Sequence, residues 1–146
     1  MFKGKKQFNQ DIGYWDTSSA TNMNEMFSNA RDFNQDISNW NTGSITNFNY
    51  MFKAAQFNRN IGQWNTSNAT SMAGMFNNNS AFNQNISSWC VGNISSLPAD
   101  FKTNSPLSNN NTPNWGTCPS QVCSISINLT SNAPTQTQSI TLGGSI

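Results

Sequence analysis

The pair Met-Phe recurs at near-constant spacing, and this repetition constrains the fold more than any other feature of the chain. The pairs begin at Met1, Met26, Met51 and Met75, so successive copies are 25, 25 and 24 residues long. A period of this length is typical of solenoids, in which each copy forms one unit of a stack. One copy supplies too little core to offset the conformational entropy of ordering it, so the copies must stack to be stable.

Other apolar positions keep the same register. Each copy carries a Phe followed by Asn, then an Ile, then a Trp. The members are Phe8, Phe33, Phe57 and Phe82; Ile12, Ile37, Ile61 and Ile86; and Trp15, Trp40, Trp64 and Trp89. A one-residue deletion falls between Met51 and Phe57. We expect the aromatic rings to form the core rather than a cofactor or sugar site, with the four Trp side chains stacked in one buried column.

A short strand that contains the Trp is predicted in each copy. Ile12, Trp15 and Thr17 have the spacing of the L-x-x-L-x-L core of a leucine-rich repeat, which is a short strand with alternate side chains inward. Thr42 and Thr66 occupy the same place as Thr17 in the next two copies, so these three Thr should point into the core. Neighbouring strands would then pair into a parallel sheet along the stack.

A short helical turn is predicted before each Met-Phe pair. Met23, Met26 and Phe27 are spaced i, i+3, i+4, which places them on one apolar face, and Thr21 is suited to cap the turn. The predicted fold is therefore an α/β repeat solenoid, leucine-rich-repeat-like, with one short parallel strand and one short helical turn per ~25-residue repeat.

Several strings carry a family resemblance: F-N-Q-D-I-S-N-W-N-T at 33–42, T-N-M-N-E-M-F at 21–27, S-W-C-V-G-N-I at 88–94 and W-G-T-C-P at 115–119. They resemble the BspA-like leucine-rich-repeat surface proteins, also known as a mycoplasma lipoprotein-associated domain of unknown function. The resemblance implies export, cell-surface display and a role in adhesion, and it implies no catalytic residues. The chain departs from the pattern at Ala20 and Ala69, where larger aliphatic residues are common, which predicts a looser core there.

The register predicts three parts. Residues 1–97 hold about four copies, and we interpret 98–119 as a C-terminal cap because Pro98 interrupts the pattern. Phe101 still matches the repeat Phe, whereas Leu107 belongs to no further copy. Alternating apolar residues at 125–129 and 140–142 favour a linker and the start of a separate β-sandwich-like domain over 120–146. Met1 falls in register inside a repeat, so we expect the array to be N-terminally truncated and part of a larger parent chain.

Cys90 occupies the place of Asp16, at the point where the last copy meets the cap. The resembling family also has such a pair of cysteines, so we expect a disulfide between Cys90 and Cys118, which argues for an oxidising compartment. A Cys118–Cys123 loop is the competing pairing. Zinc is disfavoured, because the three Cys include no C-x-x-C pair and no His is present.

Composition argues against several classes of function. The formal net charge is +1 and only 9% of residues are charged, so we expect no nucleic-acid partner. No apolar stretch is long enough to span a membrane. The absence of His removes the commonest general base, and no phosphate-binding glycine motif occurs, so we predict no catalytic residues, no cofactor and no enzyme activity. Asp11 and Asp36, one copy apart, are too few carboxylates to predict a metal site.

Two rows of polar residues should point outward from the strands and form a candidate binding face. The members are Tyr14, Asn39, Gln63 and Ser88 in one row, and Asp16, Asn41 and Asn65 in the other. We interpret the Asn after each Phe differently: stacked Asn side chains can satisfy turn amides along a solenoid, so this row should be structural. An ice-binding role for Thr17, Thr42 and Thr66 is disfavoured by their inward position.

The sequence therefore predicts a non-catalytic extracellular or cell-surface module that binds a protein or glycan ligand. The alternative is a passive structural spacer in a large secreted surface protein, because the outward positions offer few aromatic or Arg anchors.

Overall fold

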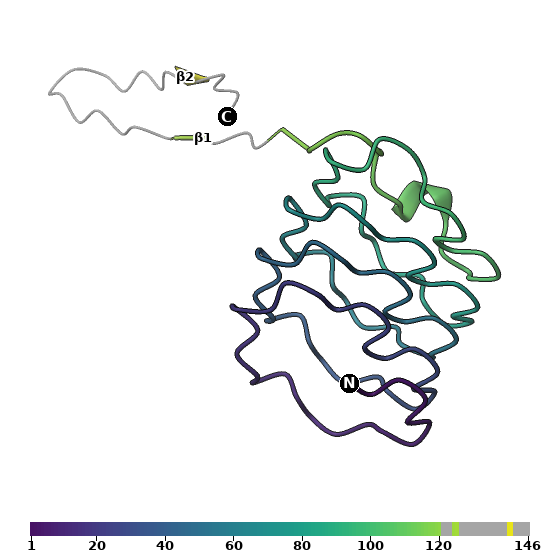
Figure 1. Cartoon of the computed structure of the whole chain (residues 1–146). Helices are drawn as coiled ribbons and strands as arrows, with labels where there is room; N and C mark the ends of the chain where they lie inside the picture. Colours follow the sequence, from purple (N-terminus) through teal and green to yellow (C-terminus); the bar gives the residue numbers. More distant parts are fainter. Residues whose placement is uncertain (121–123, 126–139, 142–146) are drawn as a thin grey trace, which may run out of the picture.

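A computed structural model describes residues 1–120, 124–125 and 140–141. Residues 1–118 form a stack of coils, visible in Figure 1 as successive turns of the ribbon with the N-terminus at one end. The register of hydrogen bonds between turns divides this stack into coil 1 (1–25), coil 2 (26–50), coil 3 (51–74), coil 4 (75–100) and coil 5 (101–118). The predicted repeats at 1–97 thus fold as one continuous stack.

Regular secondary structure is nearly absent from the described residues. It comprises one 3₁₀ turn, η1 (Asn109–Asn111), and two strands, β1 (Ser124–Ile125) and β2 (Ile140–Thr141). β1 and β2 pair antiparallel, with Ser124 opposite Thr141 and Ile125 opposite Ile140. The rest of the predicted β-domain start at 120–146 lies outside the described residues, apart from Ser120.

The predicted strand in each copy is wrong, because the residues from Ile to Trp form a turn. The backbone N–H of Trp15 donates to the carbonyl of Ile12 at 3.1 Å, and the same i to i+3 bond recurs in coils 2, 3 and 4. A second turn follows, in which the N–H of Ala20 donates to Thr17. Since these turns use the backbone groups within one coil, the groups cannot form a ladder between coils at this place.

The ladder between coils lies instead on the segment predicted to be helical. In coil 1 the N–H groups of Met23 and Glu25 donate to the carbonyls of Asn47 and Asn49, both at 2.9 Å. Alternate N–H groups of this segment bond within the local chain instead and form turns, as when the N–H of Met26 donates to the carbonyl of Met23 at 3.1 Å. The apolar i, i+3 spacing therefore marks consecutive β-turns, and the predicted helical turn is also wrong.

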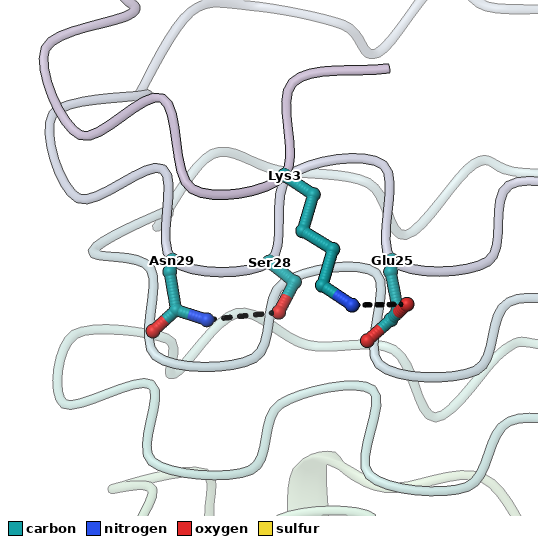
Figure 2. A network of polar contacts seen from close by, with 4 residues as sticks. All are labelled: Lys3, Glu25, Ser28 and Asn29. Atoms are coloured by element: carbon teal, nitrogen blue, oxygen red, sulfur yellow. Dashed lines mark hydrogen bonds and ion pairs between the residues drawn. The ribbon is translucent and has the colours of Figure 1, made fainter.

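Two columns of left-handed residues explain why this segment is not a helix. One column contains Glu25, Tyr50, Gly74 and Asp100, and the other contains Gly4, Asn29, Ala54, Asn78 and Asn104, all with φ between 51° and 73°. A positive φ ends a right-handed helix and turns the chain back to face the next coil. Figure 2 shows this edge: the Lys3 ammonium, near the start of coil 1, lies 2.7 Å from the carboxylate of Glu25 at the end of the same coil, and the Asn29 amide donates to the Ser28 hydroxyl at 3.2 Å.

Aromatic columns form the core, as predicted. Phe2, Phe27, Phe52 and Phe76 stack at 5.7 to 5.8 Å between ring centroids. A second column of Phe8, Phe33, Phe57 and Phe82 lies beside the first, and rings of one coil stack at 3.7 to 4.2 Å. The rings of coils 2 to 4 are fully buried, whereas Phe2 and Phe8 in coil 1 are partly exposed.

The Trp column is confirmed for three of its four members. Trp40, Trp64 and Trp89 are buried and nearly parallel, with centroids 6.5 and 6.3 Å apart. Each indole N–H donates to the Ile carbonyl of the preceding coil, at 3.0 to 3.1 Å. Trp15 differs: among the described residues, coil 1 is packed against another coil on one side only. The Trp15 ring is half-buried and lies against Phe2 at 5.9 Å.

Polar side chains bond the coils together where backbone pairing is absent. Thr17, Thr42 and Thr66 are buried, as predicted, and their hydroxyls donate to the carbonyls at 41, 65 and 90 in the next coil at 2.8 to 3.0 Å. The predicted structural Asn row is also confirmed. The N–H of Asn34 donates to the side-chain oxygen of Asn9 at 3.0 Å, and the same bond continues through Asn58 and Asn83.

Coil 5 closes the stack in a register that the sequence did not indicate. The backbone N–H of Phe76 donates to the carbonyl of Phe101, just as the N–H of Phe52 donates to the carbonyl of Met75. Phe101 therefore occupies the position of the Met in the Met-Phe pair, and Lys102 occupies the position of the Phe. Leu107 is buried at the position that Phe82 holds in coil 4. The Asn row continues into coil 5, because the N–H of Ser108 donates to the side-chain oxygen of Asn83.

One extra residue before Phe101 shifts this register. The shift also leaves Leu97 55% exposed, although Met23, Phe48 and Met72 at the same place in the other copies are buried. Coil 5 is bonded to coil 4 by the predicted disulfide, Cys90–Cys118. Cys123, the partner in the alternative pairing, lies outside the described residues.

Candidate binding face

The predicted binding face lies on the outer surface of the two turns that replace the expected strand. All seven of its residues are exposed, and they form two rows, the first across coils 1 to 4 and the second across coils 1 to 3. The first row contains Tyr14, Asn39, Gln63 and Ser88, and the second contains Asp16, Asn41 and Asn65. Tyr14 is the most prominent member, because 81% of its surface is accessible and it is the one large aromatic side chain so exposed in the described residues.

The second row is held in a fixed orientation by Asx turns. The side-chain oxygen of Asp16 accepts the N–H of Ser18 at 3.0 Å, that of Asn41 accepts the N–H of Gly43 at 3.2 Å, and that of Asn65 accepts the N–H of Ser67 at 3.1 Å. One oxygen of each side chain is therefore occupied by the turn. The amide nitrogens of Asn41 and Asn65 remain as donors, one per coil, at a spacing set by the stack.

A second set of Asx turns precedes the first row. Asp11, Asp36, Asn60 and Asn85 each accept the N–H of the residue two positions later, at 2.9 to 3.0 Å. The replacement of Asp by Asn in coils 3 and 4 keeps this bond. The acidic character of the face is thus confined to coils 1 and 2, which also hold Asp16.

Hydrogen bonding tunes two of these carboxylates. The Ser18 hydroxyl and N–H lower the pKa of Asp16 from its ordinary value of 3.8, and Ser38 does the same for the pKa of Asp36. The Arg59 guanidinium adds a smaller lowering of the Asp36 pKa. Because their pKa values are lowered, both carboxylates stay charged to a lower pH than an ordinary Asp.

The first row makes fewer bonds. The Ser88 hydroxyl donates to the Gly62 carbonyl at 3.0 Å, which fixes it against coil 3. In the part of the chain that the structure describes, the side chains of Asn39 and Gln63 make no hydrogen bond within the protein. These two amides are available to a ligand.

Sequence reasoning missed a third row that braces the stack beside the structural Asn residues. The Gln35 amide donates to the carbonyl and side-chain oxygen of Asn9, both at 2.9 Å, and Gln84 does the same to Asn58. In coil 3 the Arg59 guanidinium donates to the Asn34 carbonyl at 2.7 Å. A long donor after each Asn was the available signal.

The described residues contain no group of three or more His, Cys, Asp or Glu that could hold a metal ion. In the same part of the chain, no helix has the length and apolarity to cross a membrane. The face itself presents hydrogen-bonding groups, the exposed ring of Tyr14 and the charge of Asp16.

Comparison with known families gives one match. The family model described as "Mycoplasma protein of unknown function, DUF285" matches residues 1–57 and 53–141. The chain belongs to this family. The match agrees with the mycoplasma part of the resemblance noted above, and membership of the BspA-like leucine-rich-repeat group stays a prediction. No curated protein and no solved structure matches the chain. The junction of the two DUF285 matches, at 53–57, falls in coil 3 beside the one-residue deletion.

Proposed function

We propose that this DUF285 chain is a non-catalytic adhesion module of the BspA-like type, displayed at a cell surface or secreted. It binds a protein or glycan through the two rows of exposed side chains. The observation that carries this proposal is the second row, Asp16, Asn41 and Asn65, whose side chains are exposed yet held in one orientation by their turns. Preorganised groups lose less entropy on binding than freely rotating ones.

The chemistry of the rows favours a ligand rich in hydroxyl and carbonyl groups. Asn41 and Asn65 present amide donors, Asp16 presents an acceptor, and Tyr14 offers a flat ring against which a sugar or an apolar side chain can pack. Each coil contributes only a few contacts, so one array binds weakly. Retention then depends on avidity from many surface copies.

The Cys90–Cys118 disulfide supports the proposed location. Such bonds persist in oxidising compartments and are rare in reducing ones.

Binding screens of the folded chain, displayed multivalently, against host proteins and glycans test the proposal. The decisive variant is Asn41→Asp with Asn65→Asp, since aspartate at the equivalent Asp16 keeps the turn bond. It exchanges two outward donors for acceptors. We expect the captured ligand to lose about tenfold or more in affinity, as for removal of a buried hydrogen bond at an interface.

A second variant removes the amides altogether, by changing Asn39, Asn41, Gln63 and Asn65 to Ala. Its matched control changes four other exposed amides to Ala, namely Asn24, Gln56, Asn109 and Asn114. Equal binding by the variant and the control would show that the face is misplaced.

A passive spacer is the second candidate, and the unbroken aromatic columns from coil 1 to coil 4 favour it. Stacked rings and a continuous hydrogen-bond ladder resist bending, as a spacer requires. Absence of any ligand from a multivalent screen supports this reading over adhesion.

A further inference from the structure

The charged residues of the chain are separated by their place in the coil. All seven Lys and Arg lie in the part of a coil that runs from the Met-Phe pair to the second residue after the repeat Phe, or in the equivalent part of coil 5. We call this part of the stack the basic edge. It comprises 1–10, 26–35, 51–59, 75–84 and 101–109.

The two parts of the coil have opposite formal charge. The basic edge holds seven cations and one anion, Asp32, and therefore carries +6. The rest of the chain holds the other five acidic residues and no Lys or Arg, and therefore carries −5. The net charge of +1 thus conceals a cationic surface, which the composition alone does not indicate.

Stacking brings cations of different copies to the same edge, because each coil follows the path of the one before it. Lys6 and Arg31 hold the same position in coils 1 and 2, and Lys3 and Lys53 hold the same position in coils 1 and 3. The cations therefore form a row along the stack rather than one cluster within a coil.

Backbone hydrogen bonds fix the spacing of this row. The N–H of Gly4 donates to the Ser28 carbonyl and the N–H of Asn29 donates to the Lys53 carbonyl, both at 2.8 Å. Figure 2 looks onto this part of the edge, where Lys3 lies beside Ser28 and Asn29 of coil 2. Segments paired in this way are about 4.8 Å apart, so the backbones of Lys3 and Lys53 are about 10 Å apart.

Most of these cations have no carboxylate partner. Among the described residues, the one ion pair joins Lys3 to Glu25 at 2.7 Å. The Lys53 ammonium lies 5.3 Å from the centroid of the Tyr50 ring, which leaves its charge uncompensated. Three further cations are exposed and make no side-chain hydrogen bond in this part of the chain: Lys5, Lys6 and Arg31. Four positive charges in coils 1 to 3 are thus available to an external anion.

We propose that the basic edge binds a linear sulfated glycan that runs along the stack across coils 1 to 3. Ammonium and guanidinium groups make charge-assisted hydrogen bonds to anionic oxygens, and sulfate groups repeated along a chain match cations repeated along a stack. Exposed amides lie among the cations, at Gln7 and Gln56, and suit the hydroxyl groups of a sugar. The two rows of the proposed binding face contain no cation, so this inference does not rest on that face.

Other polyanions fit the edge less well. Proteins that bind single-stranded nucleic acid stack bases on exposed aromatic rings, whereas Tyr14, the large exposed aromatic residue of the described part, lies off the edge. Binding at a lipid surface uses exposed apolar side chains, and Leu97 lies off the edge as well, which leaves Met1 as its large exposed apolar residue. A sulfated glycan requires neither an aromatic platform nor an apolar anchor.

The test measures binding of labelled heparin to the full chain at about 0.15 M salt. The variant combines Lys6→Gln, Arg31→Gln and Lys53→Gln, which removes one cation from each of coils 1 to 3. Its matched control combines Ser19→Asp, Ser44→Asp and Ser96→Asp, three exposed positions off the edge. Both sets lower the formal net charge by three, so they separate the place of the charge from its total. Urea midpoints close to the parent confirm that both proteins are folded.

We expect the parent to bind heparin with an affinity that falls as salt rises, and chemically desulfated heparin of the same length to bind at least about tenfold more weakly. The edge variant should lose about tenfold or more in heparin affinity, and the control about twofold or less. Equal losses in the two variants would overturn the proposal, because net charge rather than the edge would then govern binding. Tighter binding to vesicles with phosphatidylserine, or to single-stranded DNA, would overturn it in favour of those partners.

Discussion

Both ends of the stack are built from the same repeat, yet one ends the aromatic columns and the other leaves them open. At the coil 5 end Lys102 replaces the repeat Phe, and Phe101 meets Phe76 edge-on, with the ring planes at 88°. Trp115 then meets Phe101 edge-on as well, at 80°. At the coil 1 end Phe2 and Phe8 keep the parallel arrangement of the inner coils: the two rings lie 3.7 Å apart at 10°, and Phe2 is parallel to Phe27 within 9°. Coil 5 therefore breaks the parallel ring arrangement that coils 1 to 4 share, so ring geometry as well as the polarity of Lys102 distinguishes the cap from the repeated coils.

The largest expected effect separates a Trp inside the stack from one at the open end. Trp64→Ala removes a buried ring with two Trp neighbours and an indole hydrogen bond, and should cost about 3–5 kcal/mol of unfolding free energy. Trp15→Ala removes a half-buried ring and should cost clearly less. Urea unfolding of both variants measures the difference, and equal losses would contradict a stack that is open at coil 1.

The next effect concerns the closed end. Cys90 and Cys118 are 28 residues apart in sequence, and a disulfide over such a loop contributes on the order of 3 kcal/mol by restricting the unfolded chain. Cys90→Ser with Cys118→Ser should lower the urea midpoint and speed amide exchange in coil 5 first. Peptide mapping without reduction checks the pairing itself, and a Cys118–Cys123 peptide would contradict it.

A buried amide in coil 4 offers a smaller effect. Asn79 takes the place of Ala30 and Ala55 and is fully buried. Its amide donates to the Phe57 carbonyl at 3.2 Å, and its oxygen accepts the N–H groups of Ala81 and Phe82 at 3.0 Å.

Asn79→Ala should cost about 1–3 kcal/mol, because these buried backbone groups lose their partner. Ser80→Ala, at the exposed neighbouring position, is the matched control. An unchanged urea midpoint for Asn79→Ala would show that water replaces the amide.

The smallest effect is a loss of stability at acidic pH that comes from two carboxylates, Asp16 in coil 1 and Asp36 in coil 2. Asp16 and Asp36 have lowered pKa values in the folded chain, so their contribution is present above the ordinary value of 3.8 and is lost as pH falls below it. Coils 3 and 4 carry Asn at the place of Asp36. Asp36→Asn should therefore weaken the loss of stability below pH 3.8 while keeping the turn, as Asn60 does. A thermal midpoint whose pH dependence matches the parent would refute this.

Much of the core could be predicted from sequence, because a repeated position has a repeated environment. The register alone indicated the buried Phe and Trp columns, the inward Thr row and the bonding role of the Asn after each Phe. The secondary structure could not be predicted in the same way. An L-x-x-L-x-L spacing is satisfied equally by a strand and by a turn from Ile to Trp, and Asx side chains at Asp11 and Asp16 decide for the turn.

The places where the repeat changes were the hardest to predict. The extra residue near Pro98 shifts Phe101 into the position of the repeat Met and leaves Leu97 exposed. Both effects depend on the backbone register rather than on residue type. Asn79 also gave no signal, because its bonds to Phe57 of the preceding coil and to Ala81 and Phe82 depend on how the backbone is placed there. The seven residues of the binding face were correctly placed on the surface, and their function stays a prediction.

The most direct test of the stacked-coil account is hydrogen exchange of the five Trp indole protons, followed one by one in NMR spectra. Trp40, Trp64 and Trp89 donate from buried positions to the preceding coil, so their protons should exchange slowly. Trp15 and Trp115 are partly exposed and should exchange fast. Three slow and two fast indole protons are predicted, and five protons that exchange at one common rate would contradict the stack.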